Sequence, residues 1–129
     1  MDATQLRLVA LVGLGGAVGS IARYGVSGLL TRGAFPWGTF AVNFSGTFLL
    51  ALVYFASLDR GYLPSEFRTF LFIGIFGGYT TFSSFGLETT ILLREGQTLL
   101  MGVNLFLNAG LCVAGAIAGA AAGIYLGGV

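Results

Sequence analysis

The feature that most constrains this chain is its shortage of charge. Six arginines and five acidic residues are the charged side chains in 129 residues, or 9% of the chain, against about a quarter in a typical soluble domain. No charge occurs from Trp37 to Leu58 or from Gly96 to Val129. With 56% hydrophobic residues and a mean hydropathy of +0.91, such a chain cannot cover a water-facing surface. The composition predicts a small polytopic membrane protein.

The chain also lacks the residues that most active-site chemistry needs. It has no histidine and a single cysteine, Cys112, which excludes a zinc site of Cys/His type and a histidine base beside a nucleophile. A net charge of +1 gives no basic field for nucleic acid. We therefore expect neither an enzyme nor a nucleic-acid partner, and a lipid bilayer as the surroundings.

Apolar stretches long enough to cross a bilayer, which takes about 20 residues, predict a helical membrane protein with four spans. They are 6–30, 37–58, 67–93 and 98–125, within a single membrane domain 1–129. The last uncharged stretch is too long for one upright span and too short for two with a loop, so we interpret it as one tilted helix. A signal peptide is the competing interpretation of the first stretch, and the length of its apolar part argues against it.

The arginines are divided evenly between the two sides of such a membrane domain. Four spans place both termini and the connection between the second and third spans on one side. That side carries Arg7, Arg60 and Arg68, and the other carries Arg23, Arg32 and Arg94. A bias in Lys and Arg orients membrane proteins, and here there is none. We predict dual topology, in which two oppositely inserted copies form an antiparallel homodimer. If Arg23 is buried instead, the count is three to two and the bias is still weak.

The centre of the third span is a poor continuous helix. It reads GIFGGYTTFSSFG from Gly74 to Gly86, and the adjacent Gly77 and Gly78 precede a run of hydroxyl residues. We predict a break near 77–81, where the two half-helix ends expose carbonyls that suit a cation and N–H groups that suit an anion. The alternative is an unbroken packing face of small residues with hydroxyls bonded to the backbone.

Aromatic and glycine residues each have two interpretations in this sequence. Phe82 and Phe85 share one face of the helix after the break. Rings at this spacing usually pack in a core or against lipid, but their positive edges can also face an anion. The 22 glycines suit either a helix break or close helix packing. For the last helix, Gly115, Gly119 and Gly123 favour packing.

Three stretches together resemble the CrcB-type, or Fluc, family of fluoride channels. They are GGYTTFSSF at 77–85, GGAVGSIARY at 15–24 and PWGTFAVNFSG at 36–46. Their order and spacing and the chain length all agree, so the resemblance covers essentially the whole chain. It implies an antiparallel dual-topology homodimer of four-helix subunits with two fluoride pores, in the inner membrane of a prokaryote. It also implies a structural Na⁺ at the dimer centre, bound by backbone carbonyls of Gly77 and Thr80.

The resemblance also implies roles for individual side chains. Phe82 and Phe85 match the paired pore phenylalanines of the family, and Asn43 matches a polar pore residue whose amide can donate to an anion. The remaining matches are the hydroxyl run beside the pore, Thr81, Ser83 and Ser84, and two vestibule residues, Arg23 and Glu88.

The fourth span departs most from the family pattern. Where the family often carries Tyr, Ser or Thr, this chain has Asn104, Asn108 and Cys112, spaced four apart and so on one helix face. We include Asn108 and Cys112 among the pore residues, and the role of Asn104 stays open. For Glu88, we favour a structural ion pair with Arg94 or with an arginine of the first span, because a negative charge in an anion path repels the anion.

A passive fluoride channel that exports the ion from the cytoplasm is the leading hypothesis. The alternative is a small multidrug-type antiporter, which also has four helices and dual topology. Cation–proton exchange requires a carboxylate embedded in the membrane, and Glu88 lies near the end of its span. A membrane scaffold would explain the glycines but gives the Thr/Ser/Phe run no purpose.

Overall fold

The computed structural model describes residues 1–58, 61 and 63–128. All regular secondary structure in these residues is helical, and four helices are long and apolar enough to cross a membrane. These spans are Ala3–Leu30, Trp37–Ser57, Ser65–Arg94 and Thr98–Gly127. The expected all-helical architecture with four membrane-spanning helices is therefore confirmed.

The first two spans are single α-helices, and the last two are composite. α1 covers Ala3–Leu30 and α2 covers Trp37–Leu58. The third span consists of α3 (Ser65–Arg68), the π-helical η1 (Thr69–Phe76), α4 (Gly77–Tyr79) and α5 (Phe82–Arg94). The fourth consists of α6 (Thr98–Leu105), the π-helical η2 (Phe106–Leu111) and α7 (Cys112–Gly127).

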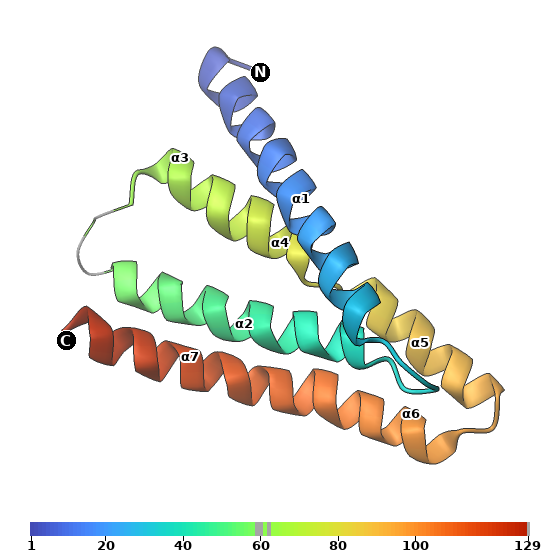
Figure 1. Ribbon diagram of the computed structural model, residues 1–129. Helices are drawn as coiled ribbons and strands as arrows, with labels where there is room; N and C mark the ends of the chain where they lie inside the picture. The colour runs from blue at the N-terminus through green and yellow to red at the C-terminus, as the bar shows by residue number, and fades with distance from the viewer. Residues whose placement is uncertain (59–60, 62, 129) are drawn as a thin grey trace.

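Close backbone contact at glycines fixes how these helices pack. α7 lies along α2 (Figure 1). A Cβ atom at Gly119 would strike the carbonyl of Phe48 on α2, and one at Gly123 would strike that of Leu52. Gly115 similarly faces the ring of Phe44. The packing role expected for these three glycines is confirmed, because larger side chains would force α2 and α7 apart.

The other close crossing joins α1 to the first half of the third span. A Cβ atom at Gly15 would meet Phe70 and Gly74, and one at Gly19 would meet the backbone of Ile75. Gly78 in turn lies against the backbone of Gly16. α1 thus packs on η1 and α4, while its N-terminal turns diverge from α2 and α7 (Figure 1).

The break in the third span lies slightly later than the adjacent glycines suggest. Gly77 and Gly78 are helical in α4, and the helix ends after Tyr79. Thr80 (φ −83°, ψ 157°) and Thr81 (φ −150°, ψ 115°) are extended. The predicted break near 77–81 is therefore confirmed, and within that range it lies at the two threonines rather than at Gly77-Gly78. The crossing explains Gly78, because a side chain there would clash with α1, whereas the two threonines carry the change of direction.

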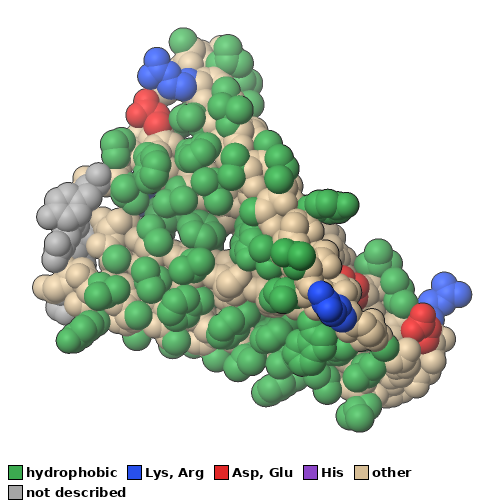
Figure 2. Space-filling view, in the orientation of Figure 1, with side chains coloured by type: hydrophobic (Ala, Val, Ile, Leu, Met, Phe, Trp, Pro, Cys, Tyr) green, Lys and Arg blue, Asp and Glu red, His purple; other side chains and the backbone are tan. Residues whose placement is uncertain are grey.

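Charged groups lie mainly at the ends of this molecule, whose surface is otherwise apolar. Figure 2 shows hydrophobic side chains over most of the visible face. At the end that carries the chain termini, Arg7 Nη1 and Glu66 Oε1 form an exposed ion pair at 3.4 Å. The 31–36 and 95–97 connections lie together at the other end (Figure 1). Arg60, which entered the arginine count, lies outside the described residues.

Candidate functional site

Asn43 on α2 satisfies the backbone where the third span is broken. Its Oδ1 accepts from the backbone N–H of Thr81 at 2.7 Å, and its Nδ2 donates to the carbonyl of Thr81 at 2.9 Å. An extended residue turns its N–H and C=O to the same side, so a single carboxamide can pair with both. Both residues are buried, and within a membrane these backbone groups have no water to replace the amide.

The carboxamide of Asn43 continues into a row of amides on the fourth span. Its Nδ2 also donates to Oδ1 of Asn108 at 2.9 Å, and Nδ2 of Asn108 donates to Oδ1 of Asn104 at 2.9 Å. Asn104 is fully buried, and its Nδ2 donates to the hydroxyl of Thr89 on α5 at 3.0 Å. The face predicted for Asn104, Asn108 and Cys112 is thus turned inward, since Cys112 is buried as well.

A groove of about 210 Å³ lies beside this amide pair and the break. Its lining combines polar and aromatic side chains: Asn43, Thr47, Thr80, Thr81, Phe82, Phe85, Asn108, Ala109 and Cys112. The ring centroids of Phe82 and Phe85 lie 5.4 Å apart, and the ring planes are nearly perpendicular, with an interplanar angle of 78°. Phe85 is 6% exposed and Phe82 is 82% exposed, so the groove has one packed wall and one open edge.

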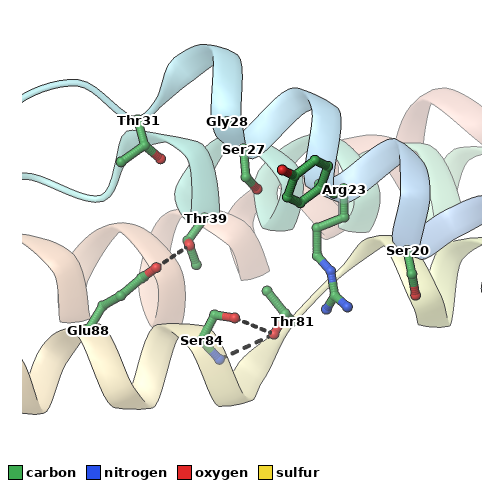
Figure 3. Close-up of a pocket in the computed structure, with 10 residues that line it drawn as sticks. Ser20, Arg23, Ser27, Gly28, Thr31, Thr39, Thr81, Ser84 and Glu88 are labelled. Carbon is green, nitrogen blue, oxygen red and sulfur yellow. Dashed lines mark hydrogen bonds between the residues drawn. The ribbon is translucent and has the colours of Figure 1, made fainter.

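A second, larger cavity of about 570 Å³ lies between α1, α2 and α5 on the other side of the break. Figure 3 shows Arg23 and Glu88 at different ends of it, with Thr81 and Ser84 between them. Arg23 Nη1 lies 3.4 Å from the carbonyl of Thr80. Thr81 caps α5, where its Oγ1 accepts from the backbone N–H of Ser84 at 3.2 Å. Thr81 lines both cavities and therefore stands at their junction.

The expected ion pair of Glu88 is not formed. Oε1 of Glu88 accepts from the hydroxyl of Thr39 at 2.6 Å, and its buried Oε2 has no hydrogen-bond partner among the described residues. Arg94 lies six positions further along α5, which is beyond the three- or four-residue spacing of side chains that meet on a helix. Arg23 is instead turned to the carbonyl of Thr80.

Most of the predicted site residues are gathered in these two cavities, with two exceptions. Ser83 is exposed and lines neither, although its hydroxyl lies 3.3 Å from that of Thr81. Gly77 is also exposed and lines neither.

Two threonines on α2 belong to the site and were missed from the sequence. Thr39 holds Glu88, and Thr47 lines the groove with its hydroxyl 3.3 Å from the carbonyl of Cys112. They lie four residues before and four after Asn43, so the three side chains form one stripe along the helix. That spacing was the signal available in the sequence.

Comparison with known proteins shows which family this chain belongs to. A family model described as CrcB-like protein, Camphor Resistance (CrcB), matches residues 10–120. The chain belongs to the CrcB-like family. The resemblance of its motifs to that family is therefore confirmed, and the matched region includes both cavities and the break.

Curated relatives in the CrcB-like family carry the name fluoride-specific ion channel FluC. The protein of Rhodospirillum rubrum is 42% identical over 81% of this chain and 84% of its own length. That of Geobacter sulfurreducens is 44% identical over 81% and 86%, and that of Geotalea daltonii 39% over 94% and 100%. These names denote ion channels, the class expected from the sequence.

We call the two hydrogen bonds of Asn43 to the backbone of Thr81 the clamp, and it predicts that the Thr81 amide is protected from hydrogen exchange. Replacing Asn43 by Ala removes the acceptor of the Thr81 N–H, and a buried donor without a partner costs about 1–3 kcal/mol. Amide hydrogen exchange at Thr81, measured by NMR, should accelerate about tenfold or more. The amide of Thr80, which donates to Phe76 within its own helix at 3.0 Å, is the internal control. Equal exchange at Thr81 in both proteins would contradict the clamp.

Proposed function

We propose that this protein is a fluoride channel that lets F⁻ leave the cytoplasm passively. The groove at the break carries the proposal, because it offers hydrogen-bond donors and ring edges without a charged side chain. Fluoride is small and strongly hydrated, so a pore must replace its water with several donors and still release it. Neutral donors meet both requirements. The names of the CrcB-like relatives support the same ion.

The path we propose runs from the larger cavity into the groove by way of Thr81. Arg23 gives the cavity a positive charge near the break, which attracts an anion from water. Ser84 and Thr81 follow as hydroxyl donors, with Ser83 at the exposed edge. Glu88 is held at the other end of the cavity by Thr39. There its charge opposes the anion least, so the pair Arg23 and Glu88 forms an asymmetric vestibule.

In the groove, Asn43 is the proposed first donor. Both of its N–H groups are engaged, one with the backbone of Thr81 and one with Oδ1 of Asn108. Fluoride entering the groove would replace Oδ1 of Asn108 as the acceptor, while the backbone bond stays. Ring edges of Phe82 and Phe85, and the weak donor Cys112, would complete its surroundings.

The open edge of the groove supports an antiparallel homodimer with two pores. Phe82 is 82% exposed beside polar groups that would otherwise face lipid. A second copy covers this edge without a different protein, and the even distribution of arginines allows both insertions. Each copy then contributes its own groove, which gives two pores in the inner membrane of a prokaryotic cell.

The C-terminal end of α4 fits the structural Na⁺ that the family implies. The N–H of Thr81 donates to Asn43, so the carbonyl of Gly77 is without its helical partner, and the carbonyl of Thr80 leaves the helix direction. Hard cations prefer such oxygens, and the helix dipole adds negative potential there. We propose that Gly77 and Thr80 of both subunits would hold Na⁺, which would neutralise facing carbonyls at the dimer centre. The long 3.4 Å contact of Arg23 with Thr80 would have to yield.

A small multidrug-type antiporter is not favoured. Its shared cation and proton site needs a carboxylate in the middle of the membrane. Among the described residues, the acidic side chains within the apolar spans are Glu66 and Glu88, and they lie toward the two ends of the third span rather than in its middle.

Flux from liposomes tests the proposed function directly. Purified protein should release F⁻ and exclude Cl⁻ by about a thousandfold or more, because the larger chloride ion cannot bring the same donors to short range. An ion-selective electrode measures each release, with protein-free liposomes as the control. Comparable release of both ions would remove the fluoride-channel assignment.

Replacing either groove phenylalanine by an aliphatic residue should slow fluoride transport without disrupting the fold. A ring interaction is worth about 1 kcal/mol, so Phe82→Ile or Phe85→Ile should lower fluoride flux about fivefold or more. Phe106→Ile, at a ring that is 68% exposed and outside the groove, is the matched control. Size-exclusion chromatography verifies that the dimer persists. Unchanged flux in both variants would return the two rings to a packing role.

The orientation of single copies tests dual topology. A cysteine tag at the C-terminus, in a Cys112→Ala background, should react with a membrane-impermeant maleimide from both faces of the cell membrane in similar amounts. Replacing Gly33 and Ala34 by Lys adds charge to one side and should shift the population toward one orientation. If the C-terminal cysteine of the protein that keeps Gly33 and Ala34 is labelled from one face only, dual topology is excluded.

A further inference from the structure

A directed chain of hydrogen bonds leaves the break, crosses two other helices and returns to the same half-helix. It runs from the N–H of Thr81 through Asn43, Asn108, Asn104 and Thr89 to the carbonyl of Phe85. The donor–acceptor distances along it are 2.7, 2.9, 2.9, 3.0 and 2.7 Å. We call these five residues and Phe85 the amide relay.

Both ends of the amide relay have fixed polarity. A backbone N–H can only donate, so Asn43 must turn its Oδ1 to Thr81, and its Nδ2 then faces Asn108. A backbone carbonyl can only accept, so the hydroxyl of Thr89 must give its proton to Phe85 and accept from Asn104. Each asparagine between these ends therefore has one permitted orientation, and a reversed amide would set two donors against each other.

Burial makes this orientation costly to lose. Asn104 is fully buried, and Asn43 and Asn108 are 9% and 8% exposed. Asn104 lines neither cavity, so it does not meet an ion in either of them. Its Oδ1 nevertheless accepts a hydrogen bond from Nδ2 of Asn108. Oδ1 of Asn108 in turn accepts from Nδ2 of Asn43 beside the groove.

We propose that Asn104 and Thr89 are positioning residues that set the orientation of the Asn108 and Asn43 amides for the passing anion. This proposal rests on the proposed function and explains a role that the motifs leave open. When fluoride takes the N–H of Asn43, Asn108 keeps its bonds to Asn104 and its oxygen remains next to the anion's position. The relay thereby restores the same arrangement once the ion has left.

Thr89 and Thr90 provide a matched pair of variants. Val has nearly the shape of Thr, and Thr89→Val leaves Nδ2 of Asn104 without its acceptor. Thr90→Val removes a hydroxyl that is exposed and donates only to the carbonyl of Gly86 in its own helix at 2.9 Å. Thr89→Ser restores the hydroxyl and serves as the rescue. Should Thr89→Val fail to fold, Thr89→Ala removes the same group without placing a methyl against the amide.

Unitary fluoride current in planar bilayers separates positioning from stability, because it counts only channels that are folded. We expect about a fivefold or greater fall in Thr89→Val, with wild-type current in Thr90→Val and Thr89→Ser. A purely structural role would reduce the number of channels and leave the unitary current unchanged, and that result overturns the proposal. Equal falls in Thr89→Val and Thr90→Val overturn it as well.

A second measurement keeps the amide relay testable independently of transport. If the wild-type protein carries no fluoride current, the proposed function fails, and the amide relay is then judged by hydrogen exchange at Thr81. Exchange should accelerate severalfold in Thr89→Val and not in Thr90→Val. Identical exchange in both variants would show that Thr89 does not act on the break.

Discussion

The pairing of one carboxamide with one extended residue is the interaction on which the rest of this structure depends. A backbone interruption within an apolar span leaves an N–H and a carbonyl that lipid cannot satisfy. Asn43 satisfies both at Thr81 from a neighbouring helix. Without it, the third span would have to remain helical or admit water at random. With it, two half-helix ends and the capping hydroxyl of Thr81 stay in place beside two cavities.

How far the sequence predicts this protein depends on how local each feature is. Span number follows from runs of apolar residues, and the inward face of Asn104, Asn108 and Cys112 follows from helical periodicity alone. The position of the break was harder, because Gly78 is required by the backbone of Gly16 on another helix. For the same reason, hydrogen bonds between side chains of different helices cannot be predicted from the sequence. Nothing near Glu88 in sequence indicates that Thr39 would be its partner.

Charge and glycine perform complementary tasks in this small membrane domain. Glycines at the α1 and α7 crossings bring backbones close enough that long, otherwise featureless helices acquire one register. Register then aligns Thr39 with Glu88 on α5, and Asn43 and Thr47 with Asn108 and the carbonyl of Cys112 on the fourth span. Polar contacts of this kind need no formal charge, so in the proposed channel the interior would attract an anion at Arg23 and still hold it loosely further on. A buried arginine in the groove would bind the ion and stop it.

The position of Thr81 is what would join the two cavities into the one path proposed for the ion. Its backbone is held by Asn43 on the groove side, while its hydroxyl caps α5 and contacts Ser84 in the larger cavity. Any change in the Asn43 amide is therefore transmitted to the residue that both cavities share. In the proposed channel, an ion leaving the cavity of Arg23 would meet donors whose orientation already depends on the groove beyond. Selectivity in such a path would then arise from the precision with which the break is held, and the residues that hold it would not need to touch the ion.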